Sequence, residues 1–394
     1  MTITEPGESS VQSANMEQGT NTVLDRNTVL DRSTVPDKNT VPDKNTVPDG
    51  NRVPAGSRLH GGWYLVALAE ELTGEVTPVE LGDRALMVIR DGDRLRILDA
   101  RCPHRGAHLG YGGRLAPGRA GAAVICPFHG KRIGLGAGTA RLCVTEYQSI
   151  VAGDAIFVRL GADPAEDRGF EQAIKEISAE KQIVGALVRL IRVPPAYVIE
   201  NAFDYSHFTA VHGVGRVTGF GLREDASGGI AVEGDFWTAV PPTVVQQTAI
   251  KQTTKPLADR GLRSRFYARA VSPSLVLSEL GPPEISHTLI TSASPVTACS
   301  TCGSSGSAGS AGSAGSAGSA GTTADRCLVR IAIGIRPAAM PAAAALVAGV
   351  RRAIDQDVVI WDHLDPAAPA RYDRGDLPAL AFRQFCAGFG PLEP

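Results

Sequence analysis

Four residues with metal-binding side chains stand in two short loops of this 394-residue chain. Each loop holds one Cys and one His: Cys102 and His104 in "RCPHRGAHLGYGG", and Cys126 and His129 in "ICPFHGKR". Two thiolates and two imidazoles can hold a single zinc ion, but zinc fingers pair Cys with Cys and His with His at short spacing. One Cys and one His from each loop suit a [2Fe–2S] cluster with two Cys on one iron and two His on the other. The sequence therefore favours the two-iron cluster, with zinc as the alternative.

A second set of candidate ligands stands in "IENAFDYSHFTAVHG", which contains Asn201, Asp204, His207 and His212. Two His five residues apart do not share one face of a regular helix, but both can reach one ion if the helix ends between them. Two His and one carboxylate with open positions form the ligand set of non-haem Fe(II) oxygenases. Taken alone, two unrelated helix histidines are the more common explanation. The Cys/His loops in the same chain favour the metal site.

The carboxylate for this second site must come from elsewhere in the chain. The candidates are three Asp residues in "AIDQDVVIWDHL": Asp355, Asp357 and Asp362. This segment follows Pro341 and an Ala-rich run, both of which suit the N-terminus of a helix. Solvated acids on a helix surface are the alternative for each Asp, and the residues alone do not choose among them.

The two loops closely resemble the motifs of the Rieske iron–sulfur family. One position departs from the family pattern, because the residue after the second loop's Gly is often Trp there and is Lys131 here. We expect a local change at the cluster edge, in partner docking, without loss of the cluster. His108 lies outside the ligand positions, and we expect it at the surface or beside the site. The cluster ligands that the resemblance implies are Cys102, His104, Cys126 and His129.

The second motif extends the resemblance to the α subunits of Rieske non-haem iron oxygenases, over about residues 61–390. In that family the Asp of this motif, here Asp204, links a cluster His to an iron His, usually across a subunit boundary. A carboxylate that accepts both imidazole N–H groups would fix their orientation and shorten the electron path. Asn201 would lie near the iron as a polar neighbour. The iron ligands that the resemblance implies are His207, His212 and Asp357.

The resemblance also implies an activity. Electrons from NAD(P)H would arrive through a ferredoxin or reductase, and O2 would be used to hydroxylate, desaturate or oxidatively cyclise an apolar substrate. Mono-oxygenation is the expected reaction, with dioxygenation and oxidative cyclisation as alternatives. The segment "LPALAFRQFCAGF" looks most like that of homotrimeric ketosteroid hydroxylases and cholesterol desaturases, so we expect a homotrimer. Natural-product oxygenases are further relatives to consider, because the Ala/Gly-rich composition hints at a high-GC genome in which such enzymes often tailor secondary metabolites.

Two other functions fit the same resemblance. One is an electron-transfer protein with a Rieske cluster and no catalytic iron. The other is the α subunit of a ring-hydroxylating dioxygenase that has a β subunit as its partner. The intact second motif argues against the first, and the terminal helix pattern favours a homotrimer over the second.

The hydrophobic pattern indicates which elements position these residues. Short β-branched runs such as "RALMVIR", "RLRILDA" and "AIFVRL" predict strands around the two loops. The second motif has helical spacing; strands follow from "GGIAVEGDFWTAV" to "CLVRIAIGI", and a helix comes near the end. We predict an α+β chain. An all-β Rieske domain covers residues 58–165, and a helix-grip-type catalytic domain covers residues 166–394, with iron between its antiparallel sheet and a covering helix.

Two biased segments are not expected to join either core. Six copies of a hexapeptide run from Asn21, and their low apolar content predicts that residues 1–57 form a disordered tail. A β-helix is the alternative, but six copies give few rungs. The Gly/Ser/Ala-rich residues 303–321 predict a flexible insert in an overgrown hairpin loop.

Composition excludes several other classes. A net charge of −2 gives no basic footprint for nucleic acid, and no run of about 18 apolar residues predicts a membrane span. Seven Cys at low density argue against a disulfide framework and for a reducing cytoplasm. Cys299 and Cys302 form a C-x-x-C with Cys327 beyond the insert, but without a fourth ligand we expect ordinary thiols. The same holds for Cys143 and Cys386.

Overall fold

The computed structural model describes residues 58–116, 123–136, 141–239, 261–281, 286–296, 326–365 and 368–392. The strands are β1 (Gly62–Leu68), β2 (Val76–Leu81), β3 (Arg84–Asp91), β4 (Arg94–Asp99), β5 (Arg114–Leu115), β6 (Ala123–Ile125), β7 (Arg132–Leu135), β8 (Cys143–Val144), β9 (Ser149–Ala152), β10 (Ala155–Leu160), β11 (Gln182–Ile191), β12 (Arg216–Arg223), β13 (Ile230–Ala239), β14 (Gly261–Ser272), β15 (Leu275–Gly281), β16 (His287–Val296) and β17 (Arg326–Ile335). The α-helices are α1 (Phe170–Glu180), α2 (Pro195–Glu200), α3 (Tyr205–Ala210), α5 (Ala343–Trp361) and α6 (Leu377–Ala387). Short 3₁₀ turns are η1 (Ala69–Glu71), η2 (Pro164–Asp167), η3 (Asn201–Phe203), η5 (Pro337–Ala342) and η6 (Arg374–Asp376).

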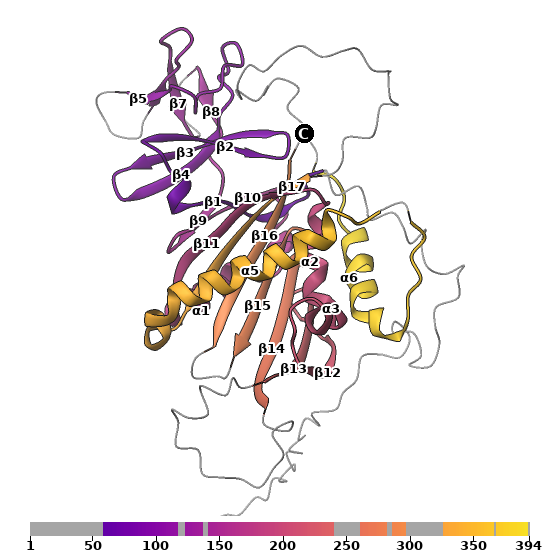
Figure 1. Cartoon of the computed structure of the whole chain (residues 1–394). Coiled ribbons are helices and arrows are strands. Elements are labelled where there is room, and N and C mark those ends of the chain that lie inside the picture. The colour runs from indigo at the N-terminus through magenta and orange to yellow at the C-terminus, as the bar shows by residue number, and fades with distance from the viewer. Residues whose placement is uncertain are drawn as a thin grey trace, which may run out of the picture. The chain divides into compact units, whose positions relative to one another are not determined.

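Three small sheets make up the N-terminal part of the described chain (Figure 1). Their strand orders are β1-β10-β9, β2-β3-β4 and β5-β6-β7-β8, and the neighbours are antiparallel except for β7 and β8. The strands predicted from "RALMVIR", "RLRILDA" and "AIFVRL" are confirmed as β3, β4 and β10. The two Cys/His loops follow β4 and β6, so a strand holds the start of each loop.

The C-terminal part contains a seven-stranded sheet of order β11-β17-β16-β15-β14-β13-β12, and every neighbouring pair in it is antiparallel. β16 and β17 pair along their whole length, from His287 opposite Ile335 to Val296 opposite Arg326. The predicted hairpin is therefore confirmed for its strands. Its insert at 303–321 and the N-terminal tail at 1–57 lie outside the described residues.

Helix α5 lies across one face of this sheet (Figure 1). Its buried residues are Val350, Ile354, Asp357 and Trp361, and their spacing of four, three and four residues places them on one stripe of the helix. Three of them join an apolar core with the sheet, and the fourth is an acid. The predicted α+β architecture, a helix over an antiparallel sheet, is confirmed. The α-helix begins at Ala343 rather than at Pro341, which lies in η5.

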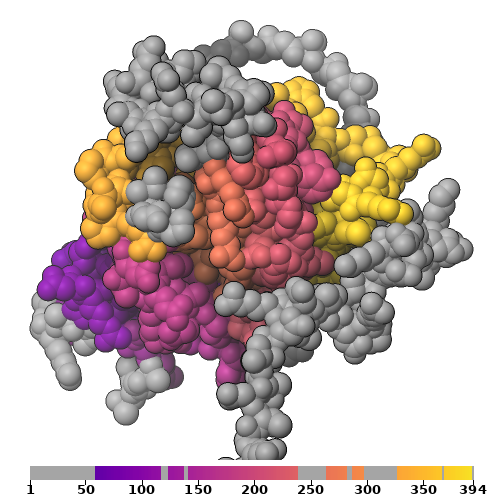
Figure 2. Space-filling view, turned by 90° about the horizontal axis from the view of Figure 1, so that it is seen from below, coloured from indigo at the N-terminus to yellow at the C-terminus, as the bar shows by residue number. Residues whose placement is uncertain are grey.

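The second motif does not form the single helix that its spacing suggests. It is divided into α2, η3 and α3, and α6 packs against this segment, with the rings of Phe203 and Phe382 stacked 4.8 Å apart. Figure 2 shows the C-terminal residues, in yellow, directly beside the pink segment that contains α2 and α3. α3 ends at Ala210, between the two His of the motif, as a shared metal site requires.

The N-terminal sheets and the seven-stranded sheet share one apolar cluster, in which Trp63 and Phe157 pack with Phe170, Leu277 and other residues. Nearby, the guanidinium of Arg330 on β17 donates two hydrogen bonds of 2.9 Å to the carboxylate of Glu71. The described residues, 58–392 with their gaps, belong to one compact unit. The expected boundary between residues 165 and 166 therefore stays a prediction.

The pH dependence of the unfolding free energy tests whether His60 is buried in this way. The imidazole is buried, its Nδ1 lies 2.7 Å from the carbonyl oxygen of Gly61, and its Nε2 lies 3.2 Å from Oγ of Ser274. Burial lowers its pKa from 6.5 to about 4, although the hydrogen bond to Gly61 acts in the opposite direction. The folded state thus favours the neutral ring, and this stabilisation is complete above pH 6.5 and is lost as the pH falls towards 4.

We expect the wild type to lose about 2 kcal/mol more unfolding free energy than His60→Gln between pH 7 and pH 5. Urea unfolding of both proteins at the two pH values measures this difference. Equal losses in both proteins would show that His60 does not titrate with unfolding.

Candidate metal centres

The two Cys/His loops have the same main-chain geometry. In the first, the N–H of Gly106 donates to the carbonyl oxygen of Cys102 at 2.8 Å; in the second, the N–H of Gly130 donates to that of Cys126 at 3.0 Å. Both glycines lie four residues after their Cys and have positive φ, +72° and +65°, which L-residues rarely adopt. Each loop is therefore closed by its own hydrogen bonds.

The thiols and imidazoles of the loops face opposite environments. Cys102 and Cys126 are only 3% and 1% exposed and belong to an apolar cluster, whereas His104 and His129 are exposed. The two imidazole centroids lie 4.9 Å apart. Two buried sulfurs and two adjacent exposed imidazoles fit a two-iron cluster with Cys on the inner iron and His on the outer one.

Cationic and aromatic residues surround the exposed imidazoles. Phe128 is 60% exposed and lies 3.8 Å from the ring of His129, and the guanidinium of Arg105 lies over Phe128 at 5.8 Å. Lys131 is exposed, and its carbonyl oxygen accepts the N–H of Cys126, so the loop closes normally with Lys at this position. His108 is half-buried beside the site, and its Nδ1 accepts the N–H of Gly110 at 3.1 Å.

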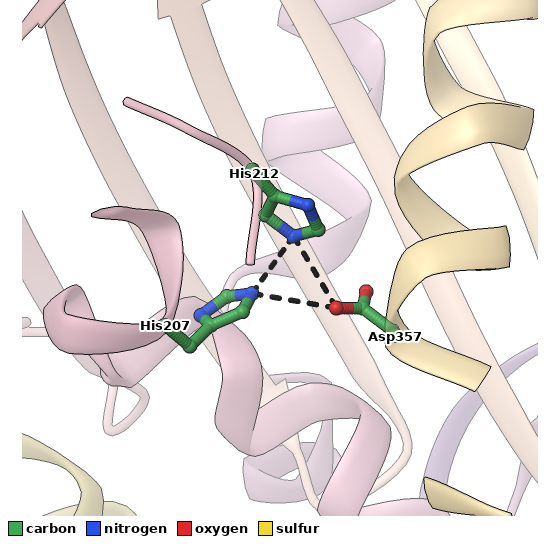
Figure 3. A group of neighbouring side chains, drawn as sticks. All are labelled: His207, His212 and Asp357. Atoms are coloured by element: carbon green, nitrogen blue, oxygen red, sulfur yellow. Dashed lines mark hydrogen bonds and ion pairs between the residues drawn. The ribbon is translucent and has the colours of Figure 1, made fainter. Parts of the chain in front are cut away.

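The second site joins His207, His212 and Asp357 (Figure 3). His207 comes from α3, His212 follows the end of that helix, and Asp357 comes from the buried stripe of α5. The two Nε2 atoms are 2.9 Å apart, and Oδ1 of Asp357 lies 3.7 Å from His207 Nε2 and 3.3 Å from His212 Nε2. The structure thus brings together all three residues that the resemblance implied as iron ligands.

The chemistry of these three groups fits a divalent cation. Nδ1 of His207 lies 2.9 Å from the main-chain oxygen of Asp204, and Nδ1 of His212 lies 3.0 Å from Oε1 of Gln356. Each Nδ1 can therefore carry the proton, which leaves two Nε2 lone pairs and a carboxylate oxygen facing one another. Ligands bound at about 2.1 Å to one ion have mutual distances of about 3 Å. Two His and one carboxylate are the set that binds mononuclear Fe(II).

Burial disfavours the charged forms of two groups of the triad, the imidazolium of His207 and the carboxylate of Asp357. Burial lowers the pKa of His207, which disfavours an imidazolium, although the hydrogen bond to Asp204 acts in the opposite direction. Burial raises the pKa of Asp357 to about 6, while His212 and a hydrogen bond from the Asn201 side chain oppose this rise. Asn201 is therefore a polar neighbour of the ligand carboxylate.

The Asp204 carboxylate has a local partner. Its Oδ1 caps α3, accepting the N–H groups of Ser206 at 2.9 Å and His207 at 3.3 Å, and the His207 imidazole contacts the main-chain oxygen of Asp204 instead. The sequence analysis expected this carboxylate to accept the imidazole N–H directly. Within the described chain it positions the His through the helix, and the link to a cluster imidazole stays a proposal.

The other two carboxylate candidates lie away from the histidines. Asp355 is exposed and pairs with Arg189, and Asp362 is exposed just beyond α5. Of the cysteines outside the loops, Cys327 and Cys386 are buried and Cys143 is exposed. Cys299 and Cys302 lie outside the described residues.

A partly buried ion pair behind the second motif was not apparent from the sequence. Arg383 of α6 donates two hydrogen bonds of 2.6 and 2.8 Å to Glu200, and also contacts the hydroxyl of Tyr372. Burial raises the pKa of Glu200, which the Arg383 guanidinium opposes. These residues line a cavity of about 290 Å³ together with Asp204, His207 and Asp357. The one charged residue in "LPALAFRQF", Arg383, was the available signal.

Part of the sequence matches known proteins. Residues 62–149 match the model of the Rieske [2Fe-2S] domain. Cholesterol 7-desaturase nvd of Drosophila melanogaster is 41% identical over 85 residues, 21% of this chain and 18% of the relative. The oxygenase component of chloroacetanilide N-alkylformylase of Rhizorhabdus wittichii is 38% identical over 73 residues, 18% of this chain and 20% of the relative. The matches thus span about a fifth of each relative.

Solved structures cover far more of the chain. The terminal oxygenase of carbazole 1,9a-dioxygenase from Novosphingobium sp. KA1 has a TM-score of 0.57 at 14% identity, over 88% of this chain and 97% of that one. The oxygenase in a ferredoxin complex of carbazole 1,9a-dioxygenase has a TM-score of 0.55 at 13% identity, over 85% and 91%. The protein therefore has the fold of Rieske terminal oxygenases. Its residues 62–149 are a Rieske [2Fe–2S] domain.

In the described part of the chain, none of the helices is long and apolar enough to cross a membrane.

The raised pKa of Asp357 predicts that metal binding by the triad weakens in acid. Below pH 6 the carboxyl becomes neutral in the metal-free protein, so a metal must displace its proton. We expect the apparent dissociation constant for Co(II) to rise about fivefold between pH 6 and pH 5 through this group. Titration calorimetry of wild type and Asp357→Asn measures it. The variant should bind more weakly at pH 7 and have a shallower pH dependence; parallel profiles would exclude Asp357 as the titrating ligand.

Proposed function

We propose that this chain is the terminal oxygenase component of a Rieske-type oxygenase. It uses O2 and electrons from NAD(P)H, delivered by a ferredoxin or reductase, to hydroxylate, desaturate or oxidatively cyclise an apolar substrate. Mono-oxygenation is the reaction we place first. One observation carries the proposal: the chain joins the loops of a Rieske domain to a separate site of two imidazoles and one buried carboxylate. A protein that only transfers electrons has no use for the second site.

The two sites would have separate roles, and different residues serve each. When bound, a [2Fe–2S] cluster supplies single electrons and a mononuclear Fe(II) supplies the chemistry of dioxygen reduction. Cys102 and Cys126, which are buried, and His104 and His129, which are exposed, would hold the cluster, and an electron donor could approach the exposed imidazoles. The triad supplies three ligands, which leaves positions open for exogenous groups.

An apolar wall beside the triad supports an apolar substrate. Phe208 lies 4.4 Å from the ring of His207 and 4.7 Å from that of Phe236. Phe236 and Phe266 stack at 4.7 Å, and both belong to the core between the sheet and α5. Phe208 excludes water from one side of His207, and the buried rings of Phe236 and Phe266 behind it offer a polar substrate no hydrogen bonds. The sterol, chloroacetanilide and carbazole named for the compared proteins agree with this class and do not select a member of it.

A second copy of the chain is the partner we propose at the Asp204 cavity. The cluster imidazoles are exposed on each chain, and the cavity lined by Asp204, His207 and Asp357 is open to a neighbour. Ile360 and Leu364 line the same cavity and are 50% and 41% exposed, which suits an interface. Asp204 would then connect a neighbour's cluster His to His207 in a homotrimer. A heteromer with a β subunit is the alternative, and the mass of the native assembly decides between them.

The cationic rim around the cluster makes donor docking testable. Arg105 and Lys131 are exposed beside the imidazoles, so an electron donor with an acidic face is favoured. We expect Lys131→Glu and Arg105→Glu to slow cluster reduction by a reduced plant-type ferredoxin about tenfold at low ionic strength. Stopped-flow absorbance measures the rate. Arg352→Glu, on an exposed position of α5, is the control, and equal slowing there would argue against a local docking site.

Metal content tests the proposal as a whole. Protein purified anaerobically should contain about three irons and two sulfides per chain and show a Rieske-type EPR signal when reduced. His207→Ala should keep the cluster spectrum, lose one iron and lose turnover, whereas Asp355→Asn should keep all three irons. Two irons in the wild type would favour the electron-transfer protein. Zinc without sulfide, or turnover in His207→Ala, would overturn the proposal.

A further inference from the structure

The two imidazoles of the triad are oriented by different kinds of group. The Nδ1 of His207 faces a main-chain oxygen within its own helix cap, that of Asp204. The Nδ1 of His212 faces a side chain from a distant element, Oε1 of Gln356 on α5, at 3.0 Å. We propose that Gln356 is a positioning residue for the iron site, whose amide oxygen holds His212 with Nε2 directed at the metal. The inference rests on the proposed iron site.

His212 needs such a partner because the helix no longer holds it. α3 ends at Ala210, and the next glycine, Gly213, has a φ of +67°, so the chain turns away directly after the ligand. Rotation of the ring about its Cβ–Cγ bond would put Cε1 in the position of Nε2 and so remove the lone pair that faces the other two ligands. A hydrogen bond to Nδ1–H opposes this rotation and fixes the tautomer that leaves Nε2 free.

The chemistry of glutamine makes the contact selective. An amide oxygen accepts Nδ1–H, and the Nε2 lone pair then faces Asp357 and His207. The opposite amide orientation would present an NH₂ group to Nδ1 and require the proton on Nε2, where it blocks the metal. The orientation of the Gln356 amide therefore decides whether Nε2 of His212 is free to bind a metal ion.

Gln356 also ties two ligands to one helix. It precedes Asp357 on α5, with its own side chain exposed and that of Asp357 buried. One residue pair thus supplies a ligand directly and orients a second ligand from another element. A shift of α5 would move both, so the position of this helix sets the geometry of the site.

Three substitutions test the role. Gln356→Met keeps the length of the side chain and removes the acceptor, so Fe(II) affinity should fall about tenfold. Gln356→Glu restores an acceptor and should restore most of the affinity. Arg352→Gln lies one turn earlier on the same helix and should match the wild type. Affinity is measured by anaerobic titration calorimetry of Fe(II) into protein that retains its cluster, with the cluster EPR signal and the thermal midpoint as checks on folding.

The outcomes separate this inference from the proposed function. If His207→Ala abolishes binding and Gln356→Met binds as the wild type does, the iron site stands and the inference is overturned. If His207→Ala also binds normally, the iron site itself fails. A loss in Gln356→Met that Gln356→Glu does not restore, or that comes with a lower thermal midpoint, shows a packing role and also overturns the inference.

Discussion

Two imidazole nitrogens that face each other at 2.9 Å, with a carboxylate oxygen beside them, repel unless a proton or a metal ion lies among them. The rest of the catalytic part can be understood as the scaffold that keeps these atoms together. Asp204 caps the helix that carries His207, and α5 brings Asp357 from the opposite side. The sheet beneath α5 supplies the apolar core that fixes the distance between the two helices.

The ion pair of Glu200 and Arg383 supports this scaffold from behind. It fastens α6 to the end of α2, next to the residues that lead to the triad, while the stacked Phe203 and Phe382 fill the adjacent core. Breaking a partly buried pair of this kind is costly, because either partner alone would be a poorly solvated charge without its counter-ion. The segment between α2 and α3 therefore has a fixed base despite its irregular path.

Features that depend on residues close together in the chain could be predicted from the sequence. Both Cys/His loops and the strands before them follow from spacing and residue type, whereas the division of the second motif into α2, η3 and α3 does not. Asp357 is distinguishable from Asp355 and Asp362 because it alone lies on the buried stripe with Val350, although the resemblance, not this stripe, led us to it. Contacts between distant segments were not visible: Gln356 meets His212 across 144 positions, and Arg383 meets Glu200 across 183. The cap formed by Asp204 was overlooked because its family role was considered instead.

The self-closed Cys loops have a consequence for the biogenesis of the protein. Zinc fingers fold only when the metal arrives, because their ligands are unordered without it. Here the glycine turns at Gly106 and Gly130 and the surrounding apolar cluster define the loops through protein contacts alone. A cluster-assembly system would therefore meet loops whose closing hydrogen bonds do not involve the ligand side chains. The thiols of Cys102 and Cys126 are buried and the imidazoles are exposed. The cofactor would therefore enter from the side of the imidazoles and reach the sulfur ligands last.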